Sequence, residues 1–152
     1  MRTRQHSREV LFAEDALRIL SPDDVAELGR RALASPSGKL RICLHHSPDA
    51  ALHEMLVALR RDVRYPPHRN RKSEETHFVL LGTAALLLFR EDGAIAERIL
   101  LGDAASGRPG YSRIPANMYH RLEVESDVCV FLETKLGPFD PADNEPLSLP
   151  KE

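Results

Sequence analysis

The sequence predicts an all-β domain preceded by a single helix. From residue 40 onward, short apolar segments are separated by turn-forming residues, a pattern typical of a β-sandwich or a closed barrel. One segment before residue 40 shows helical periodicity between capping residues instead. The 152 residues suit one domain around one hydrophobic core, and no linker or internal repeat interrupts them.

The helix is expected over residues 22–34. Ser21 is a good N-cap, Pro22 suits the first helical position, and the two aspartates that follow favour the positive end of the helix dipole. The helical spacing of apolar residues ends in a segment rich in serine, proline and glycine. The preceding residues are ambiguous: 10–12 suit a short strand, and 16–20 suit a helical turn or another strand.

Most of the remaining chain alternates in the manner of β-strands. The expected strands cover residues 40–46, 55–59, 76–81, 83–90, 94–101, 111–114, 120–124 and 128–135. Gly82 is interpreted as a hairpin turn between its two flanking strands, and Glu91–Gly93 as another hairpin turn. We therefore divide the single domain, residues 1–152, into an N-terminal strand and helix segment (1–36), a barrel core (40–136) and an irregular tail (137–152).

Composition excludes several classes of protein. The net charge is −2, and the positive and negative side chains are interspersed, so nothing indicates nucleic-acid binding. No apolar run is long enough to span a bilayer, and the N-terminus lacks the pattern of a signal peptide. Cys43 and Cys129 show no metal spacing and are expected to be buried free thiols. A soluble, cytoplasmic protein is the expectation.

Two groups of residues carry candidate metal ligands. The first reads His68-x-Asn70, four residues, Glu75, six residues, Gly82, and lies on the way into an apolar strand. The second, further downstream, reads Pro115-x-Asn117-x-x-His120. Asn is the non-glycine residue that best tolerates a positive φ, so Asn117 can replace a turn glycine.

In this order the two groups resemble the two motifs of the cupin superfamily. That family has His-x-His where this chain has His68-x-Asn70, and glycine where it has Asn117. The resemblance implies a cupin double-stranded β-helix, a jelly-roll barrel, with the helix at its N-terminal side. It also implies a divalent metal site formed by His68, Glu75 and His120, with Asn70 as a weaker fourth ligand. Two imidazoles and one carboxylate suit Zn, Ni, Fe or Mn.

A finer resemblance is to the WbuC family of small cupin-fold metalloproteins, often met in gene clusters for bacterial polysaccharides. It covers about residues 25–141 and is carried by Arg41-x-Cys43-x-His45, Tyr65–His68, the downstream motif and residues 132–141. The family pattern has Asn and His where this chain has Cys43 and Asn70. Both departures fall on the expected site.

Three further residues are candidates for catalysis. Arg41 and His45 share one face of a predicted strand, which in the resemblance lines the cavity, and an arginine there suits a carboxylate or phosphate of a substrate. The alternative for Arg41 is a solvent-facing position on an edge strand. His77 points to the same side as Glu75, as a replacement ligand, a partner that orients Glu75, or a hydrogen-bonded core histidine. Tyr119 is expected to point away from the metal.

Three functions remain open at this point. The first is a metal-dependent isomerase or lyase acting on a small polar or sugar-derived molecule in polysaccharide metabolism. The second is a metal- or ligand-binding cupin without catalysis, a sensor or accessory protein. The third is a non-haem iron dioxygenase. We further expect a small-molecule ligand in the barrel and a homodimer, because residues 76–81 and 83–89 are apolar on both faces.

Overall fold

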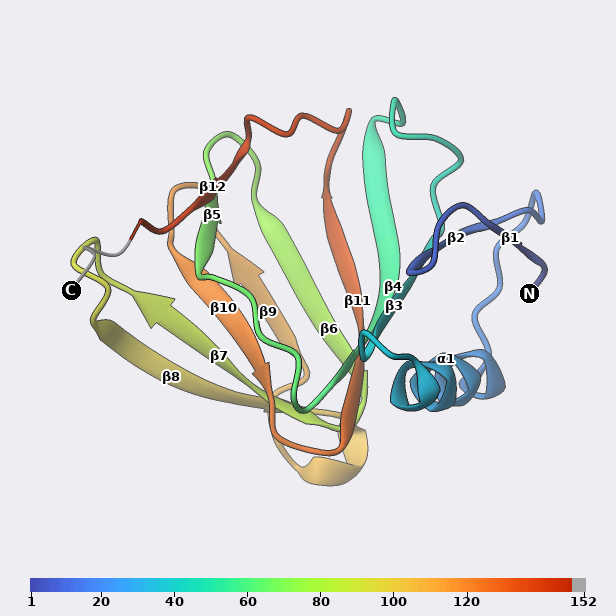
Figure 1. Ribbon diagram of the computed structural model, residues 1–152, viewed down its shortest axis with the longest axis horizontal. Coiled ribbons are helices and arrows are strands. Elements are labelled where there is room, and N and C mark those ends of the chain that lie inside the picture. The colour runs from blue at the N-terminus through green and yellow to red at the C-terminus, as the bar shows by residue number, and fades with distance from the viewer. Residues whose placement is uncertain (149–152) are drawn as a thin grey trace.

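Two facing β-sheets and one helix make up the structure, a computed structural model that describes residues 1–148 (Figure 1). In chain order the elements are β1 (Thr3–Gln5), β2 (Val10–Ala13), α1 (Pro22–Ala34), β3 (Lys39–Cys43), β4 (Leu52–Arg60), β5 (His68–Asn70), β6 (Glu75–Leu81), β7 (Thr83–Phe89), β8 (Ile95–Gly102), the 3-10 turn η1 (Ala104–Ser106), β9 (Tyr111–Ile114), β10 (His120–Val124), β11 (Val128–Leu136) and β12 (Asn144–Pro146).

The strands form a jelly roll of two sheets. One sheet has seven strands in the order β1-β2-β3-β4-β11-β6-β9, and the other has five in the order β12-β5-β10-β7-β8. All neighbours are antiparallel except β2 and β3. Figure 1 shows the two sheets close together at one end and splayed at the other. The splayed end leaves room for a cavity between the sheets.

Helix α1 has the predicted bounds because its start is specified locally. The Ser21 hydroxyl accepts from the Asp24 amide, and the Asp24 carboxylate accepts from the Ser21 amide, which completes a capping box. The apolar face of α1 then packs on the outer face of the seven-stranded sheet (Figure 1). The buried residues of this outer core are Leu11, Ala13, Val25, Leu28, Ala32, Leu40, Ile42, Leu56, Ala58 and Val130.

A second core fills the closed end between the two sheets. Its members include Val79 of β6, Leu86 of β7, Leu122 of β10 and Phe131 of β11, all at most 3% exposed. Because side chains alternate along a strand, residues 129 and 131 of β11 face this core, whereas Val130 faces α1. Further along β11 the inward positions become charged, where the closed core gives way to the cavity.

The expected hairpin at Gly82 is wrong. β6 pairs with β11 and β9 in the seven-stranded sheet, while β7 pairs with β10 and β8 in the other, so the chain changes sheets at Gly82. Gly82 has φ of 84°, and a Cβ there would lie 2.4 Å from the Val128 carbonyl oxygen. Only glycine fits this crossing. The hairpin through Glu91–Gly93 is confirmed, since β7 and β8 pair directly.

Three smaller expectations also differ from the structure. The expected tail is not wholly irregular, because β12 pairs with β5 and extends the five-stranded sheet, although residues 149–152 lie outside the described part. β3 ends at Cys43, before the expected end at residue 46. Residues 16–20 form neither helix nor strand.

Asn117 has φ of 66° and thus occupies the conformation expected for a turn glycine.

The outer face of β7 and the end of β6 are covered within the chain. Leu80 and Leu81 of β6 pack against the outer core beneath α1. Leu87 of β7 is 1% exposed and lies between Arg98 and Arg121 in the sheet, whose guanidinium groups both pair with Glu123. The aliphatic stems of such residues shield an apolar surface from water. Phe78 of β6 and its register partner Tyr111 remain 45% and 56% exposed, and the homodimer stays a prediction.

The structure bears on the predicted state of the cysteines and on membrane-spanning segments. Cys43 and Cys129 are both buried and free, as predicted. No helix among residues 1–148 is long and apolar enough to cross a membrane.

Candidate metal centre and cavity

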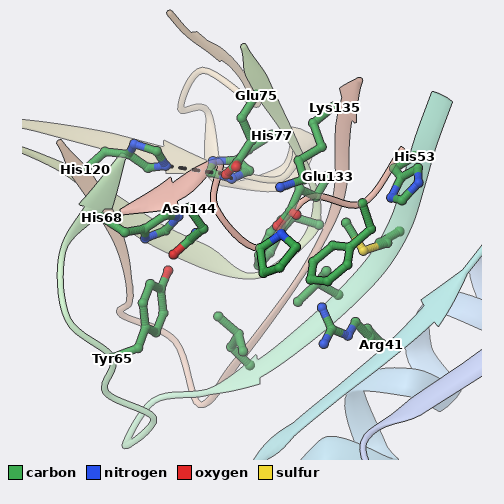
Figure 2. Close-up of a pocket in the computed structure, with 16 residues that line it drawn as sticks. Arg41, His53, Tyr65, His68, Glu75, His77, His120, Glu133, Lys135 and Asn144 are labelled. Carbon is green, nitrogen blue, oxygen red and sulfur yellow. Dashed lines mark hydrogen bonds and ion pairs between the residues drawn. The ribbon is translucent and has the colours of Figure 1, made fainter. Parts of the chain in front are cut away.

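A cavity of about 480 Å³ opens between the two sheets at their splayed end (Figure 2). Both sheets contribute side chains, and the C-terminal segment closes part of one side. The lining residues are Arg41, His53, Met55, Val57, Leu59, Tyr65, His68, Glu75, His77, His120, Phe131, Glu133, Lys135, Phe139, Pro141 and Asn144. The volume suits a small organic ligand.

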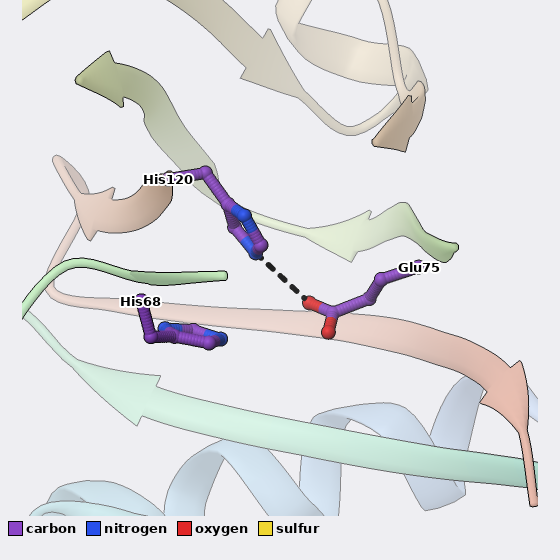
Figure 3. Close-up of side chains that lie close together, drawn as sticks. All are labelled: His68, Glu75 and His120. Atoms are coloured by element: carbon purple, nitrogen blue, oxygen red, sulfur yellow. Dashed lines mark hydrogen bonds and ion pairs between the residues drawn. The ribbon is translucent and has the colours of Figure 1, made fainter. Parts of the chain in front are cut away.

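His68, Glu75 and His120 meet at one end of this cavity. His68 and His120 are direct register partners on β5 and β10, whereas Glu75 begins β6 in the opposite sheet. One potential ligand atom from each of the three lies within 4.8 Å of the other two (Figure 3). The cluster therefore spans the gap between the sheets, and it forms only when both sheets are in place.

The hydrogen bonds around His120 leave an acceptor facing Glu75. His120 Nδ1 lies 2.9 Å from the Met118 carbonyl oxygen, which can only accept, so Nδ1 carries the proton in the neutral ring. Nε2 is then an unprotonated nitrogen 3.4 Å from Glu75 Oε1. Two acceptors that face each other repel, and a cation between them would satisfy both.

Asn70 adds a third acceptor and helps to hold Glu75. Its side-chain amide donates to Glu75 Oε2 at 2.7 Å, and its Oδ1 is buried without a hydrogen-bond partner among the described residues. Buried carbonyl oxygens are usually satisfied, so an unpaired one beside two other acceptors is consistent with a cation site. The structure thus places Asn70 next to the cluster as a partner of Glu75.

His77 orients Glu75 from the other side. Its Nε2 lies 2.7 Å from Glu75 Oε1, where it donates to the carboxylate. His77 is buried and faces the cavity within hydrogen-bonding distance of Glu75, and its role as a replacement ligand stays a prediction. Two hydrogen bonds therefore hold the carboxylate that the sequence indicates as a metal ligand.

Electrostatics keeps the cluster in the protonation states that metal binding needs. Burial, aided by the neighbouring His120, lowers the pKa of His68 to about 4, so its imidazole is neutral at pH 7. Burial alone would raise the pKa of Glu75, but the adjacent imidazoles of His120 and His77 outweigh it and hold this pKa well below its usual range. The His68 nitrogen and the Glu75 oxygens are thus available as ligand atoms without loss of a proton.

The register between β11 and β6 determines which side chains lie next to one another on the cavity floor. Along β11, Phe131, Glu133 and Lys135 all face inward; Glu133 lies opposite His77 of β6, and Lys135 lies opposite Glu75. Sequence reasoning missed Glu133 and Lys135 as site residues. A signal was present, because one face of this strand changes from apolar to charged as it leaves the core.

Glu133 is the cavity carboxylate that no described side chain neutralises by an ion pair. Burial, followed by the charge of nearby Glu75, raises the pKa of Glu133 to about 7. Glu133, His77 and Glu75 also offer ligand atoms within 4.8 Å of one another. A carboxyl group with such a pKa can both accept and donate a proton near neutral pH.

The other candidate residues have separate outcomes. Arg41 lies on β3 and lines the cavity mouth, whereas His45 lies beyond the end of β3, where its Nδ1 approaches the Glu54 carbonyl at 3.1 Å. The expectation that His45 faces the cavity is wrong, because the strand alternation ends at Cys43. Tyr119 lies outside the cavity with Arg69 over its ring, so it points away as predicted.

The donor set fits a divalent metal ion. Two imidazoles, one carboxylate and a free amide oxygen match the nitrogen and oxygen ligands of Zn, Fe, Mn or Ni. An ion held by His68, Glu75 and His120 would act as a Lewis acid on a bound oxygen or lower the pKa of a bound water. The metal's identity is not determined by these donors.

Comparisons with known proteins show the family and the fold. Residues 20–101, more than half of the chain, match the family model described as "Domain of unknown function (DUF6016)". None of the curated proteins compared with the chain matches its sequence.

Three solved structures resemble the chain. Protein SO0799 from Shewanella oneidensis is 18% identical with a TM-score of 0.56, over 74% of this chain and 75% of that chain. PAC13 from Streptomyces, solved with uridine, is 15% identical with a TM-score of 0.56, over 74% and 80%. The capsular polysaccharide assembling protein CapF from Staphylococcus aureus is 17% identical with a TM-score of 0.56, over 72% of this chain but 30% of CapF.

These structural neighbours are cupin-fold proteins, so the predicted fold class, a cupin jelly roll with one N-terminal helix, is confirmed. Their low identity speaks for the fold alone. The finer resemblance to WbuC stays a prediction.

Proposed function

We propose that the chain, which belongs to the DUF6016 family, holds a divalent metal ion on His68, Glu75 and His120 and catalyses an isomerase- or lyase-type reaction on a small polar molecule. The observation that carries this proposal is the cluster of acceptors at the end of a ligand-sized cavity. A cation there would polarise an oxygen of the substrate and make a neighbouring C–H bond more acidic.

Glu133 is the group that we assign to proton transfer. It faces the same cavity, has no ion-pair partner among the described residues and can exchange a proton near pH 7. Isomerases and lyases of polar substrates commonly need one such group beside an activated carbonyl or hydroxyl. A sugar-derived substrate is supported only by analogy, since PAC13 was solved with uridine and CapF is described as assembling capsular polysaccharide.

One observation is equally compatible with a second candidate, a metal- or ligand-binding cupin without catalysis. Both oxygens of Glu75 already accept hydrogen bonds, from Asn70 and from His77. A carboxylate held in this way suits a site that stores or senses a ligand as well as one that turns it over. Only a measurement of turnover separates the two functions.

The first experiment measures the metal. Protein purified without chelator should contain about one divalent ion per chain, and Glu75→Gln should lose most of it, because a charged oxygen ligand becomes neutral. His45→Gln, a histidine outside the cavity, is the matched control and should keep the ion. Wild-type protein that binds no divalent metal under any loading condition would rule out the proposal.

The second experiment tests proton transfer without knowledge of the product. Metal-loaded protein is incubated in D2O with a panel of sugars, sugar acids and sugar phosphates, and deuterium incorporation is followed by NMR. The proposed enzyme should label at least one compound, and Glu133→Gln should reduce the rate by about 100-fold or more. Metal binding without labelling would favour the non-catalytic candidate.

A further inference from the structure

Two cations face the cavity without a partner of opposite charge. Lys135 of β11 and Arg41 of β3 both line it, and neither forms an ion pair with any residue in the described part of the chain. Many other surface arginines are paired, for example Arg98 with Glu125 and Arg113 with Glu74. Lys135 is only partly exposed, so its ammonium group gives up part of its hydration, and the nearby Glu133 does not approach it closely enough for an ion pair.

Lys135 lies beside the metal cluster. It is the register partner of Glu75 on β6 and of His53 on β4, and Figure 2 shows its amine directed into the cavity near Glu133. A ligand atom that approached the metal from the cavity would therefore come within the range of the Lys135 side chain.

Arg41 lies towards the cavity mouth. Its register partner is Val57 on β4, four residues from His53, which corresponds to about 13 Å along the strand. Met55 and Val57 line the wall between the two cations, beside Glu133 and Phe131 of the neighbouring strand β11. The cavity thus has a cation beside the metal cluster, Glu133 among apolar side chains in the middle and a second cation at the mouth.

Without a metal, the acidic side chains that line the cavity do not exceed the basic ones in charge. Glu75 and Glu133 contribute at most two negative charges, and Arg41 and Lys135 contribute two positive charges. A divalent ion on the cluster would leave an excess of at least two positive charges in a partly enclosed space. An anionic ligand would compensate that excess, whereas a neutral one would not.

We propose that Lys135 forms an anion subsite next to the metal cluster, so that the substrate of this cavity carries a carboxylate or a phosphate group. Arg41 at the mouth attracts the same group on entry. The inference rests on the proposed function, because the charge excess arises with the metal, and it specifies the substrate class that the proposed function leaves open. The shared chemistry is a small oxyanion attached to a polar or sugar-like body.

The test compares three probes of similar size by calorimetry on zinc-loaded protein: glucuronate, glucose 6-phosphate and neutral glucose. At least one anionic probe should bind about tenfold or more tightly than glucose, as a charge-assisted hydrogen bond to an ammonium group implies. The better of the two anions distinguishes a carboxylate substrate from a phosphate substrate. The preference should weaken as sodium chloride is increased.

Three variants connect the preference to Lys135. Lys135→Met keeps the length of the side chain, removes its charge and should abolish most of the difference between anion and glucose, while Lys135→Arg should keep part of it. Arg90→Met changes the net charge equally at an exposed position outside the cavity and should behave as wild type. Zinc content is measured on every variant, so that loss of the metal is not mistaken for loss of the subsite.

The outcomes separate this inference from the proposed function. If zinc binds as expected but neither anion binds better than glucose, or if Lys135→Met keeps the full preference, the subsite is overturned and the metal centre stands. If wild-type protein binds no metal, the proposed function fails. A preference for anions that persists without metal and disappears in Lys135→Met would still support the subsite.

Discussion

The two faces of the seven-stranded sheet have opposite characters although they belong to the same strands. On the outer face, beneath α1, Leu56, Ala58 and Val130 are completely buried among apolar neighbours. On the inner face, the alternate residues of these strands include Met55, Glu133 and Lys135, which line the cavity. The outer face therefore stabilises the fold, and the inner face retains polar groups that a purely stabilising design would replace.

The largest effect is expected on the outer face. Leu56→Ala should lower the free energy of unfolding by about 2–5 kcal/mol, because it leaves a cavity under α1 that the sheet cannot fill. Leu52→Ala on the same strand, where the leucine is 48% exposed, should cost far less. Urea denaturation of both variants measures the difference. Equal losses would mean that the outer face is not the stabilising side.

On the inner face, removal of a charged group should raise the free energy of unfolding. The pKa of Glu133 is raised in the folded state to about 7 from an ordinary value near 4.3, so its contribution to stability is present below the ordinary pKa and is lost as the pH rises through about 7. Glu133→Gln should therefore be more stable than wild type at pH 8, by on the order of 2 kcal/mol.

That gain should shrink as the pH falls towards 5, where Glu133 is protonated in the wild type. Denaturation is measured in EDTA across the pH range, so that metal binding does not contribute. Glu97→Gln, an exposed glutamate on β8, is the control and should show little change. A Glu133→Gln variant less stable than wild type at pH 8 would contradict the assigned electrostatics.

A smaller effect is expected where α1 begins. Ser21→Ala removes the hydroxyl that accepts from the Asp24 amide and should lower the free energy of unfolding by about 1 kcal/mol. Ser148→Ala, at an exposed position, is the control. Because α1 contacts only the outer face, we expect metal binding to be unchanged in both variants. A loss of metal affinity in Ser21→Ala would show that the two faces are coupled.

The parts of the fold that could be predicted are those specified by neighbours in the sequence. The bounds of α1 follow from Ser21, Pro22 and the residues that end the run, all within one or two turns of the helix. The crossing at Gly82 could not be distinguished from a hairpin, because both place glycine between two apolar strands. The distinction depends on β9, β10 and β11, which occur later in the chain.

The candidate site likewise contains residues that short motifs predict and residues that only the pairing of distant strands brings into place. His68, Glu75 and His120 were proposed from spacing within two short motifs, and the structure brings them together, although no measurement yet tests them as ligands. Glu133 and Lys135 lie outside the two metal-ligand motifs. Their relation to Glu75 is set by the register of β11 against β6, which alternation within one strand does not determine. The error at His45 has the same origin, since the end of β3 depends on its pairing with β4.

The most direct test of the metal centre is thermal unfolding with and without Zn(II) at pH 7.5, for wild type, Glu75→Gln and His45→Gln. The ligands come from both sheets, so the metal should bind the folded state and stabilise wild type by about 2.7 kcal/mol at a hundredfold excess over Kd. His45→Gln should show the same gain, and Glu75→Gln should lose most of it. An equal gain in all three proteins would place the metal elsewhere and contradict the account.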